Sequence, residues 1–434
     1  MQRNCCRGVG SHGFFSPCPI PFSATSLPGG CNGMFENILG QTEVVDRLKQ
    51  DLVGRTLPPS LLFVGQPYSG KLSTALELAR VLSCEEGRGE WNCPCKSCEA
   101  HRLLLAPNTV LLGGRYFTAE VAACCDTLSR TQNLSGRYLF ARSVRKLTRR
   151  FDALLWEGEE SRLTRITPFL GRLEELVFEL GPHGTPLPAP EKLNKRLEET
   201  ITLVRKVEDS ISVVSVPVGM VRRVASWAHL TGTETTKVII LENADRLLDA
   251  SRNALLKLLE EPPSSVYLIL TTSRRNAIIP TILSRVRTYT FHPRIGPSAR
   301  EVLERIFKVE SDEYSDLESF FLLFQGVKPS ALRGYVVQFL KSAWEEEGEL
   351  PTEIAMDLFQ DREKFRIFLQ ELVNFLQEIL RNRSLTDVPY SPSLSQMEEW
   401  IHLIRKSVES LEVLNVHPLL LGERLFIHMR RNHA

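Results

Sequence analysis

An apolar run, a glycine-bearing loop with a lysine, and a helical pattern follow one another within residues 60–82. The run SLLFV at 60–64 has the length and composition of a buried strand, and GQPYSGKLS at 65–73 leads into a helical pattern at 73–82. In such a loop the backbone N–H groups curl around an anion, and the dipole of the following helix adds to the attraction. This order of segments predicts an α/β fold with an anion site beside a strand.

Two further apolar runs extend the same architecture. They are KVIIL at 237–241 and VYLIL at 266–270, with a helical pattern at about 250–259 between them. Short continuous apolar runs are typical of parallel strands that are buried on both faces. The alternation of helical patterns and short strands begins at Phe35 and predicts an open α/β sheet.

The glycine loop has the spacing of a phosphate-binding loop but lacks one of its parts. Gly65 and Gly70 let the backbone curl around a polyphosphate, and Lys71 supplies positive charge. The next position normally holds a Ser or Thr that binds Mg²⁺, and here it holds Leu72. Ser73 has a hydroxyl, but one residue further along a helix it points about 100° away. ATP binding is therefore left open, and the alternative is a simple turn with an incidental lysine.

The residues after the strand at 237–241 are altered in a parallel way. Glu242 stands where a nucleoside triphosphatase places an Asp near the metal, and Asn243 stands where a Glu would activate the attacking water. Glu242 could still face a metal, whereas Asn243 cannot accept a proton. Without a magnesium ligand, the ion that neutralises charge on the phosphates is not held, and without a general base the attacking water is not activated. We expect little or no ATP hydrolysis by this chain.

Four of the ten cysteines lie close together in CEEGRGEWNCPCKSC at 84–98. Cys84, Cys93, Cys95 and Cys98 offer a complete tetrahedral thiolate shell for a structural zinc ion. Such a site can supply roughly 10 to 16 kcal/mol to local folding. Cys93 and Cys95 are more closely spaced than is usual, so His101 is an alternative ligand for one position. The other interpretation is a set of reduced or redox-active thiols.

Composition and charge exclude several classes of protein. The 434 residues are 43% hydrophobic and 24% charged, and 53 Lys and Arg against 52 Asp and Glu leave a formal charge of +1. These values exclude a collagen-like, low-complexity or small disulfide-rich chain. Contact with nucleic acid then requires a local patch or an assembly. No apolar run approaches the roughly 20 residues that cross a bilayer, so we expect a soluble, cytoplasmic protein without membrane partners.

The remaining segments differ from the α/β pattern. Residues 1–33 lack periodicity, and we interpret them as a disordered tail or as upstream sequence outside the functional protein. Helical patterns on either side of a Pro-rich stretch at 181–190 predict a helical insertion at about 115–210. Its basic turn at 145–150 is either a solvated helix face or a contact for a phosphate backbone or a partner. After residue 292 the patterns are helical.

Several segments, in this order, resemble the AAA+ clamp-loader subunits of bacterial DNA polymerase III, most closely the delta-prime subunits. Besides the phosphate loop and the cysteine cluster, they are MFENILGQ at 34–41, KVIILENADRLL at 237–248, LLKLLEEPPSSVYLILTT at 255–272 and IIPTILSRV at 278–286. The resemblance implies a RecA-like AAA+ domain at 34–290 that contains the zinc module at 84–101 and the insertion. It further implies a small helical lid at 291–346 and an all-α collar at 347–434 for oligomerisation.

The resemblance also implies roles for individual residues. In the family, the Arg of a Ser-Arg-Cys motif reaches the ATP site of the neighbouring subunit, and Arg285 matches it, with Val286 in place of the Cys. Thr272 lies where active members sense the γ-phosphate, whereas Pro329 stands where they carry a second sensing Arg. The chain thus resembles a subunit that helps its neighbour to hydrolyse ATP without doing so itself.

The implied partners are other clamp-loader subunits in a ring of pentamer type, a sliding clamp and primed DNA, within the DNA polymerase III holoenzyme, a nucleotidyltransferase assembly. Two alternatives stay open at this point. One is an active motor ATPase of the same family, in which Ser73 or a shifted water restores magnesium binding. The other is a zinc-bearing adaptor that binds DNA outside any clamp loader.

Overall fold

A computed structural model of the chain provides the coordinates. It describes residues 33–184, 186–210, 216–230, 236–310, 314, 316–345, 348–381, 392–412, 414 and 416–431. The expected tail at 1–33 therefore lies, except for Gly33, outside the described residues. None of the helices in these ranges is long and apolar enough to span a membrane.

The central element is a five-stranded sheet with the order β2-β3-β4-β1-β5, in which each neighbouring pair is parallel. Its strands are β1 (Ser60–Val64), β2 (Thr109–Leu112), β3 (Lys237–Leu241), β4 (Val266–Thr272) and β5 (Arg287–Thr290). Their side chains are mostly buried on both faces, as parallel strands require. The prediction of a parallel α/β sheet is confirmed.

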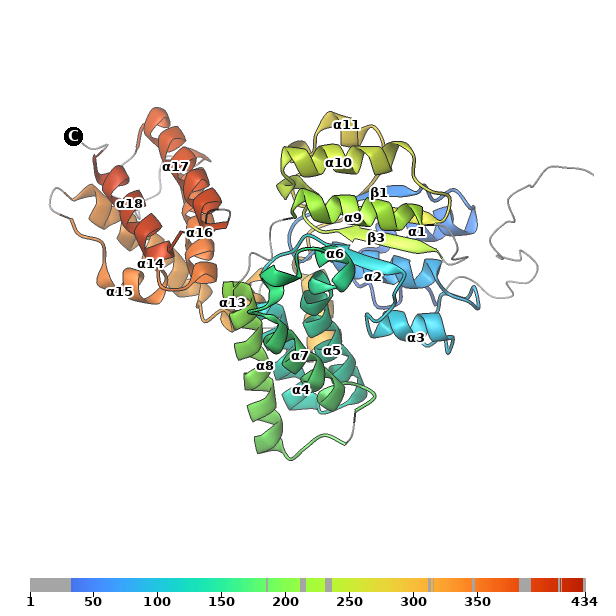
Figure 1. Ribbon diagram of the computed structural model, residues 1–434. Coiled ribbons are helices and arrows are strands. Elements are labelled where there is room, and N and C mark those ends of the chain that lie inside the picture. Colours follow the sequence, from blue (N-terminus) through green and yellow to red (C-terminus); the bar gives the residue numbers. More distant parts are fainter. Residues whose placement is uncertain are drawn as a thin grey trace, which may run out of the picture.

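Helices cover both faces of this sheet (Figure 1). On one face Leu61 and Phe63 of β1 pack with α1 (Thr42–Val53) and α2 (Lys71–Leu82). On the other face Leu62 belongs to the core that includes α9 (Val218–His229) and α10 (Asp249–Glu260). Since successive side chains of a strand point to opposite faces, one apolar run fills two cores.

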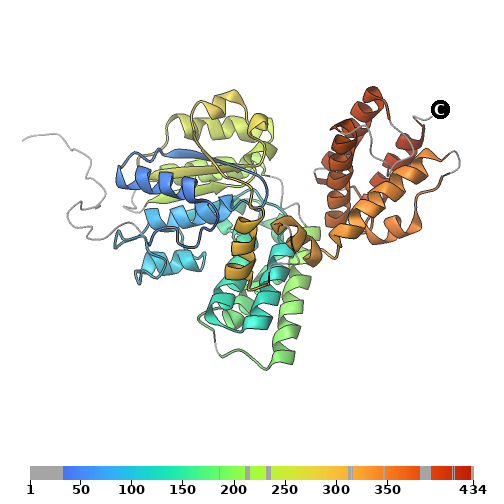
Figure 2. The same cartoon turned by 180° about the vertical axis from the view of Figure 1, so that it is seen from behind.

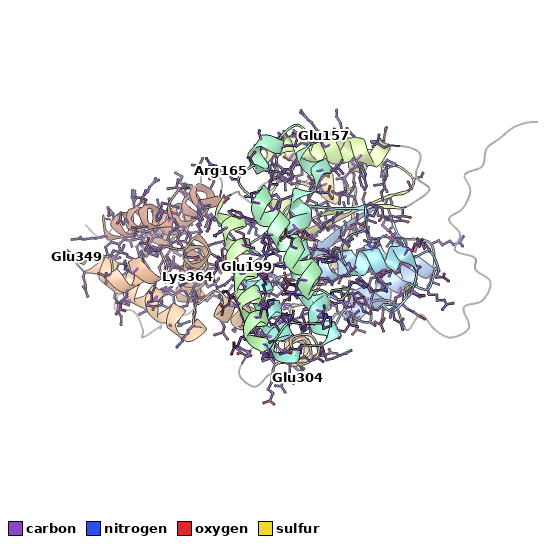
Figure 3. The ribbon with its side chains drawn as sticks, turned by 60° about the horizontal axis from the view of Figure 1, so that its bottom comes forward. Glu157, Arg165, Glu199, Glu304, Glu349 and Lys364 are labelled. Atoms are coloured by element: carbon purple, nitrogen blue, oxygen red, sulfur yellow. The ribbon has the colours of Figure 1, made fainter. Side chains whose placement is uncertain are left out.

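The region that was predicted to be a helical insertion contains a group of packed helices, α4 (Thr118–Thr131), α5 (Leu134–Thr148), α6 (Ala153–Trp156), α7 (Thr167–Leu180) and α8 (Pro190–Ser210). The Pro-rich stretch forms the connection between α7 and α8. Glu199 of α8, which Figure 3 labels, forms an ion pair with Arg172 of α7 at 2.7 Å and thereby connects the two helices.

The basic turn at 145–150 faces the protein interior, so neither interpretation of it was right. Two of its arginines donate to backbone carbonyls, Arg145 to that of Leu103 and Arg149 to those of Ala106 and Thr109. Its other two cations form ion pairs, Lys146 with Glu120 and Arg150 with Glu242. These bonds satisfy backbone carbonyls and carboxylates that would otherwise lose their partners on burial. The turn therefore joins the insertion to the loop between α3 (Lys96–Arg102) and β2.

The region after β5 is helical, as predicted, and its helices divide between two cores. α12 (Pro297–Val302) and α13 (Leu317–Phe324) pack against α4. A separate core holds α14 (Pro329–Trp344), α15 (Thr352–Asp357), α16 (Arg362–Arg381), α17 (Leu394–Glu412) and α18 (Pro418–Arg431), which stand apart from the sheet (Figure 2). The predicted lid at 291–346 is thus split, because α14 shares the core of the terminal helices.

A buried acid lies near the end of α8. Glu208 accepts hydrogen bonds from the backbone N–H of Phe117 and, at 2.7 Å, from the hydroxyl of Thr118. Burial, reinforced by the like charge of Glu363, raises the pKa of Glu208 to about 8, although both hydrogen bonds oppose the shift. The folded state therefore favours the protonated carboxyl group. The stability that the protonated form of Glu208 contributes is fully present below the ordinary pKa of 4.5. It is lost as the pH rises through about 8, because the buried carboxyl group then has to ionise.

We expect a Glu208→Gln variant to match the wild-type free energy of unfolding at the acidic end of this window and to exceed it at the alkaline end. The amide mimics the neutral carboxyl group, and each unit of pKa shift corresponds to about 1.4 kcal/mol, so the difference reaches a few kcal/mol. Urea denaturation of both proteins across the window measures it. Parallel stability curves would contradict the assignment.

Candidate functional site

The loop at 65–70 that was predicted to bind phosphate, called the phosphate loop below, joins β1 to α2 and is filled by its own lysine. Lys71 donates from Nζ to the carbonyls of Gly65 and Gln66, both at 2.6 Å. Burial lowers the pKa of Lys71 to about 8, although the carboxylate of Glu242 opposes the shift. The ammonium group is thus held among backbone dipoles at the start of the helix.

Gly70 has a φ of +94°, a left-handed conformation that favours glycine. A Cβ atom at this position would lie 2.5 Å from Nη2 of Arg294. Arg294 in turn donates from Nη2 to the carbonyl of Leu39, at 2.7 Å. The sequence patterns do not mark Arg294, because it belongs to no motif and lies 226 positions after Tyr68, whose carbonyl in the loop it contacts.

The two positions after the lysine have different surroundings. Leu72 is buried in the core that α1, α2 and the sheet share, so it is a packing residue. Ser73 follows it on α2 and is partly exposed. The hydroxyl that would bind magnesium is therefore replaced by part of the apolar core.

Glu242 follows β3 and is enclosed by two arginines. Its carboxylate pairs with Nε of Arg115 at 3.0 Å and with Nη2 of Arg150 at 2.6 Å. Burial opposes ionisation, but the two guanidinium groups hold the pKa of Glu242 below its ordinary value. Both also lie over the ring of Phe117, at 5.0 and 5.4 Å from its centroid. The carboxylate therefore has two counter-ions that belong to the chain itself.

The neighbouring polar residues are also engaged in contacts within the chain. Asn243 has a φ of 55° and donates from Nδ2 to the carbonyl of Gly114 at 2.9 Å. Thr272, at the end of β4, donates to a carboxylate oxygen of Asp245 at 2.7 Å. Arg274 pairs with the other oxygen of Asp245 at 2.8 Å.

The topology brings most of the predicted nucleotide-site residues to one edge of the sheet. β1, β3 and β4 are adjacent parallel strands, and the phosphate loop, Glu242 and Thr272 follow or lie at their carboxyl ends. This is the edge at which parallel α/β sheets bind ligands. Arg115 and Arg150 reach the same edge from the helical insertion, and of the two only Arg150 belongs to the basic turn that the sequence pattern marks.

Arg285 follows α11 (Pro280–Leu283), and its side-chain partners lie on α10, on α11 and at the adjacent Ser284. Its guanidinium donates to the carbonyl of Thr281 at 2.8 Å and pairs with Glu260 at 2.9 Å. The side chain is 34% exposed. It is therefore a partly exposed cation held on the surface that α10 and α11 form.

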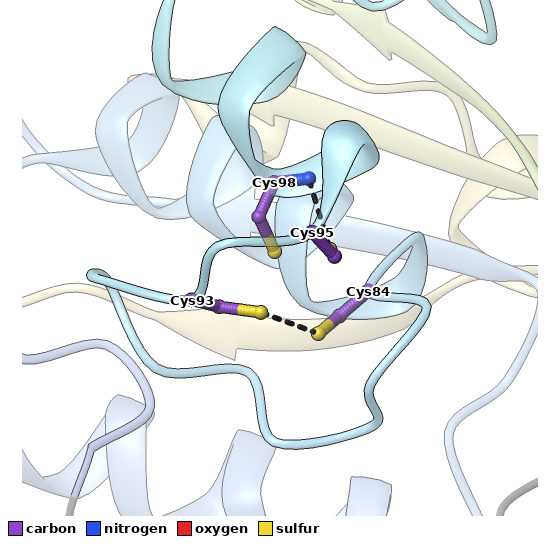
Figure 4. A group of neighbouring side chains, drawn as sticks. All are labelled: Cys84, Cys93, Cys95 and Cys98. Atoms are coloured by element: carbon purple, nitrogen blue, oxygen red, sulfur yellow. Dashed lines mark hydrogen bonds between the residues drawn. The ribbon is translucent and has the colours of Figure 1, made fainter.

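The four predicted metal ligands come together in the segment after α2 and in the first turn of α3. The sulfur atoms of Cys84, Cys93, Cys95 and Cys98 lie within 4.8 Å of one another (Figure 4). Cys84 and Cys93 are 3.7 Å apart at sulfur, close to the distance of about 3.8 Å between thiolates on one tetrahedral zinc ion. The cluster could hold a metal ion and is compatible with structural zinc. His101 is buried and lies outside this set.

Comparison with known proteins finds subunits of DNA polymerase III. Residues 190–294, from α8 to just after β5, match the family model described as DNA polymerase III, delta subunit. Subunits named delta' of DNA polymerase III from Haemophilus influenzae and Bacillus subtilis are 34% identical over 90 residues and 38% identical over 72 residues. These stretches are 21% and 16% of this chain and 27% and 22% of the relatives. A gamma/tau subunit from Mycobacterium tuberculosis is 36% identical over 74 residues, which are 17% of this chain and 13% of that protein.

This chain resembles the clamp-loader subunits of DNA polymerase III. The matching stretches span less than a third of each of these relatives. The matched family region contains Glu242, Thr272, Arg285 and Arg294, whereas the phosphate loop and the cysteine cluster precede it.

Proposed function

We propose that this chain is a delta-prime-like subunit of a DNA polymerase III clamp loader that does not hydrolyse ATP itself. It sits in a ring with other clamp-loader subunits, presents Arg285 to the ATP site of a neighbour and helps to place a sliding clamp on primed DNA. The similarity to delta' and gamma/tau subunits supports the class of assembly. The geometry at the edge of the sheet supports the absence of hydrolysis.

The pairing of Glu242 with Arg115 and Arg150 carries the proposal. A magnesium ion at this carboxylate would have to displace buried ion pairs and would face two positive charges. Leu72 offers no hydroxyl to the ion, and Asn243 cannot accept the proton of an attacking water. Phosphoryl transfer depends on both functions.

The surroundings of Arg285 support a role in a neighbouring site. An exposed ion pair such as that with Glu260 contributes only about 0–1 kcal/mol. A phosphate group of higher charge can therefore take the guanidinium from the carboxylate at little cost. In this proposal Arg285 is the catalytic residue that the chain provides, and it acts in trans.

Two further parts complete the proposal. Gly65, Gly70, Lys71, Ser73 and Thr272 are the remnant of a nucleotide site, in which ATP could bind only after Lys71 had left the carbonyls of Gly65 and Gln66. The four cysteines hold a structural zinc ion. We propose an AAA+ unit at 34–290, with α12 and α13 packed against its helical insertion, and a terminal helical unit that begins at α14.

Steady-state ATPase of the isolated full chain tests the central claim. We expect turnover at the level of the Lys71→Ala variant, with and without primed DNA. Turnover that the Lys71→Ala substitution abolishes would show an active motor ATPase instead. Salt-dependent binding of DNA by the isolated chain, together with no association with a motor subunit, would support an adaptor outside any clamp loader.

A further inference from the structure

Arg80 lies in the last turn of α2, is only 1% exposed, and uses all of its hydrogen-bond donors. The five N–H groups of an arginine form a fixed planar fork. Those of Arg80 donate to both oxygens of Glu77 at 3.1 and 2.6 Å, to the carbonyl of Gly89 at 2.7 Å, to the carbonyl of Glu90 at 2.6 Å and to the sulfur of Cys98 at 3.2 Å. The guanidinium is therefore buried with a partner for every N–H group, and one of these partners is a sulfur atom of the cysteine cluster.

We propose that Arg80 is a positioning residue of the cysteine metal site, which hydrogen-bonds the Cys98 thiolate and shapes the loop that carries the other ligands. Glu77 fixes the plane of the guanidinium from within α2. The bonds to Gly89 and Glu90 hold the loop between Cys84 and Cys93 in place. One side chain thereby connects a ligand, the loop between two other ligands, and a helix of the main core.

The charge of the site favours such a donor. Four thiolates around a divalent ion carry a net charge of −2, and burial makes that charge costly unless hydrogen bonds and cations surround it. Arg80 is neutralised by Glu77, so its contribution is the directed N–H group at sulfur. Arg102 adds positive charge beside the ligands, since it donates to the carbonyl of Cys93 at 2.7 Å. The backbone N–H of Cys98 donates to the sulfur of Cys95 at 3.3 Å.

The same contacts link the metal site to the phosphate loop. α2 begins at Lys71 in the loop and carries Arg80 in its last turn, so the metal module holds one end of the helix whose other end forms the anion site. Loss of the metal is expected to loosen α2 through Arg80. This inference rests on the proposed metal site and is independent of the clamp-loader role.

The test uses full-length protein and the metal ions Zn²⁺ and Co²⁺. Arg80→Lys keeps the charge but loses the fork, and Arg80→Gln loses both. We expect each variant to bind Zn²⁺ about 10 to 100-fold more weakly, measured by competition with a chelating indicator. In the Co²⁺-loaded variants the sulfur-to-cobalt charge-transfer band is expected to move to lower energy, because the Cys98 thiolate has lost a hydrogen bond.

Arg142→Lys is the matched control. Arg142 donates to the carbonyls of His101 and Arg102 beside the module but makes no bond to a ligand sulfur among the described residues. Its variant should keep the wild-type affinity and band position. Wild-type affinity together with an unshifted band in Arg80→Lys would overturn the proposal, as would a wild-type chain that binds neither ion. If Arg80→Gln fails to fold, Arg80→Lys decides alone.

Discussion

Replacement of Arg285 with alanine is expected to lower the DNA-stimulated ATPase rate of the adjacent motor subunit by about 10³ to 10⁵-fold. In the proposed assembly the guanidinium stabilises charge that develops on the γ-phosphate of the neighbour, and alanine supplies none. The residue is free to act in this way because its side chain is partly exposed and its ion pair with Glu260 lies at the surface. Steady-state turnover of the motor subunit, co-purified with wild-type or variant chain, measures the effect.

Arg275→Ala is the control for this experiment. Arg275 is an exposed cation of the segment between β4 and α11, so the substitution removes the same charge from the same region. We expect it to leave the rate unchanged. Arg285→Lys should lie between alanine and wild type, because an ammonium group keeps the charge but not the planar fork. Equal rates for Arg285→Ala and wild type in an intact assembly would remove the trans-acting role.

Replacement of Arg150 with alanine is expected to lower the free energy of unfolding by about 3 to 5 kcal/mol. Arg150 is 5% exposed, and its Nη2 lies 2.6 Å from a carboxylate oxygen of Glu242. Without it, Glu242 keeps Arg115 as its remaining ion-pair partner in a buried position. Denaturant unfolding with an unchanged dependence on denaturant concentration gives the difference in stability.

A second substitution separates the charge effect from lost packing. Glu242→Gln in the Arg150→Ala background removes the buried carboxylate that has lost one of its two counter-ions, and it should recover part of the loss. Arg162→Ala is the control, because that arginine is 53% exposed and surface substitutions usually change stability by no more than about 0.5 kcal/mol. A loss for Arg150→Ala that is no larger than for Arg162→Ala would mean that the buried pair is not a source of stability.

The main strands were predictable because their apolar runs are continuous. The runs at 60–64 and 237–241 coincide with β1 and β3, and that at 266–270 lies within β4. β2 and β5 were not predicted. β2 has only four residues, and β5, with the sequence RTYT, is a partly exposed edge strand without an apolar run.

The local parts of the candidate site were also predictable, whereas its long-range contacts were not. The glycine loop and the four cysteines are read from spacing, which reflects the geometry of one turn or one ion. The bonds of Glu242 join residues 127 and 92 positions apart, and no periodic pattern marks such pairs. Arg80 could not be distinguished from an ordinary helix arginine, because its role depends on a loop that folds back over it.

The arginines at Glu242 have a consequence for the working cycle of an assembly. A metal ion exchanges with the solvent, and its occupancy follows the supply of magnesium and nucleotide. Arg115 and Arg150 are tethered to the carboxylate by the chain, so their effective concentration is constant. In the proposed ring, the carboxyl end of β3 would therefore keep one electrostatic state while neighbouring ATP sites bind and release nucleotide.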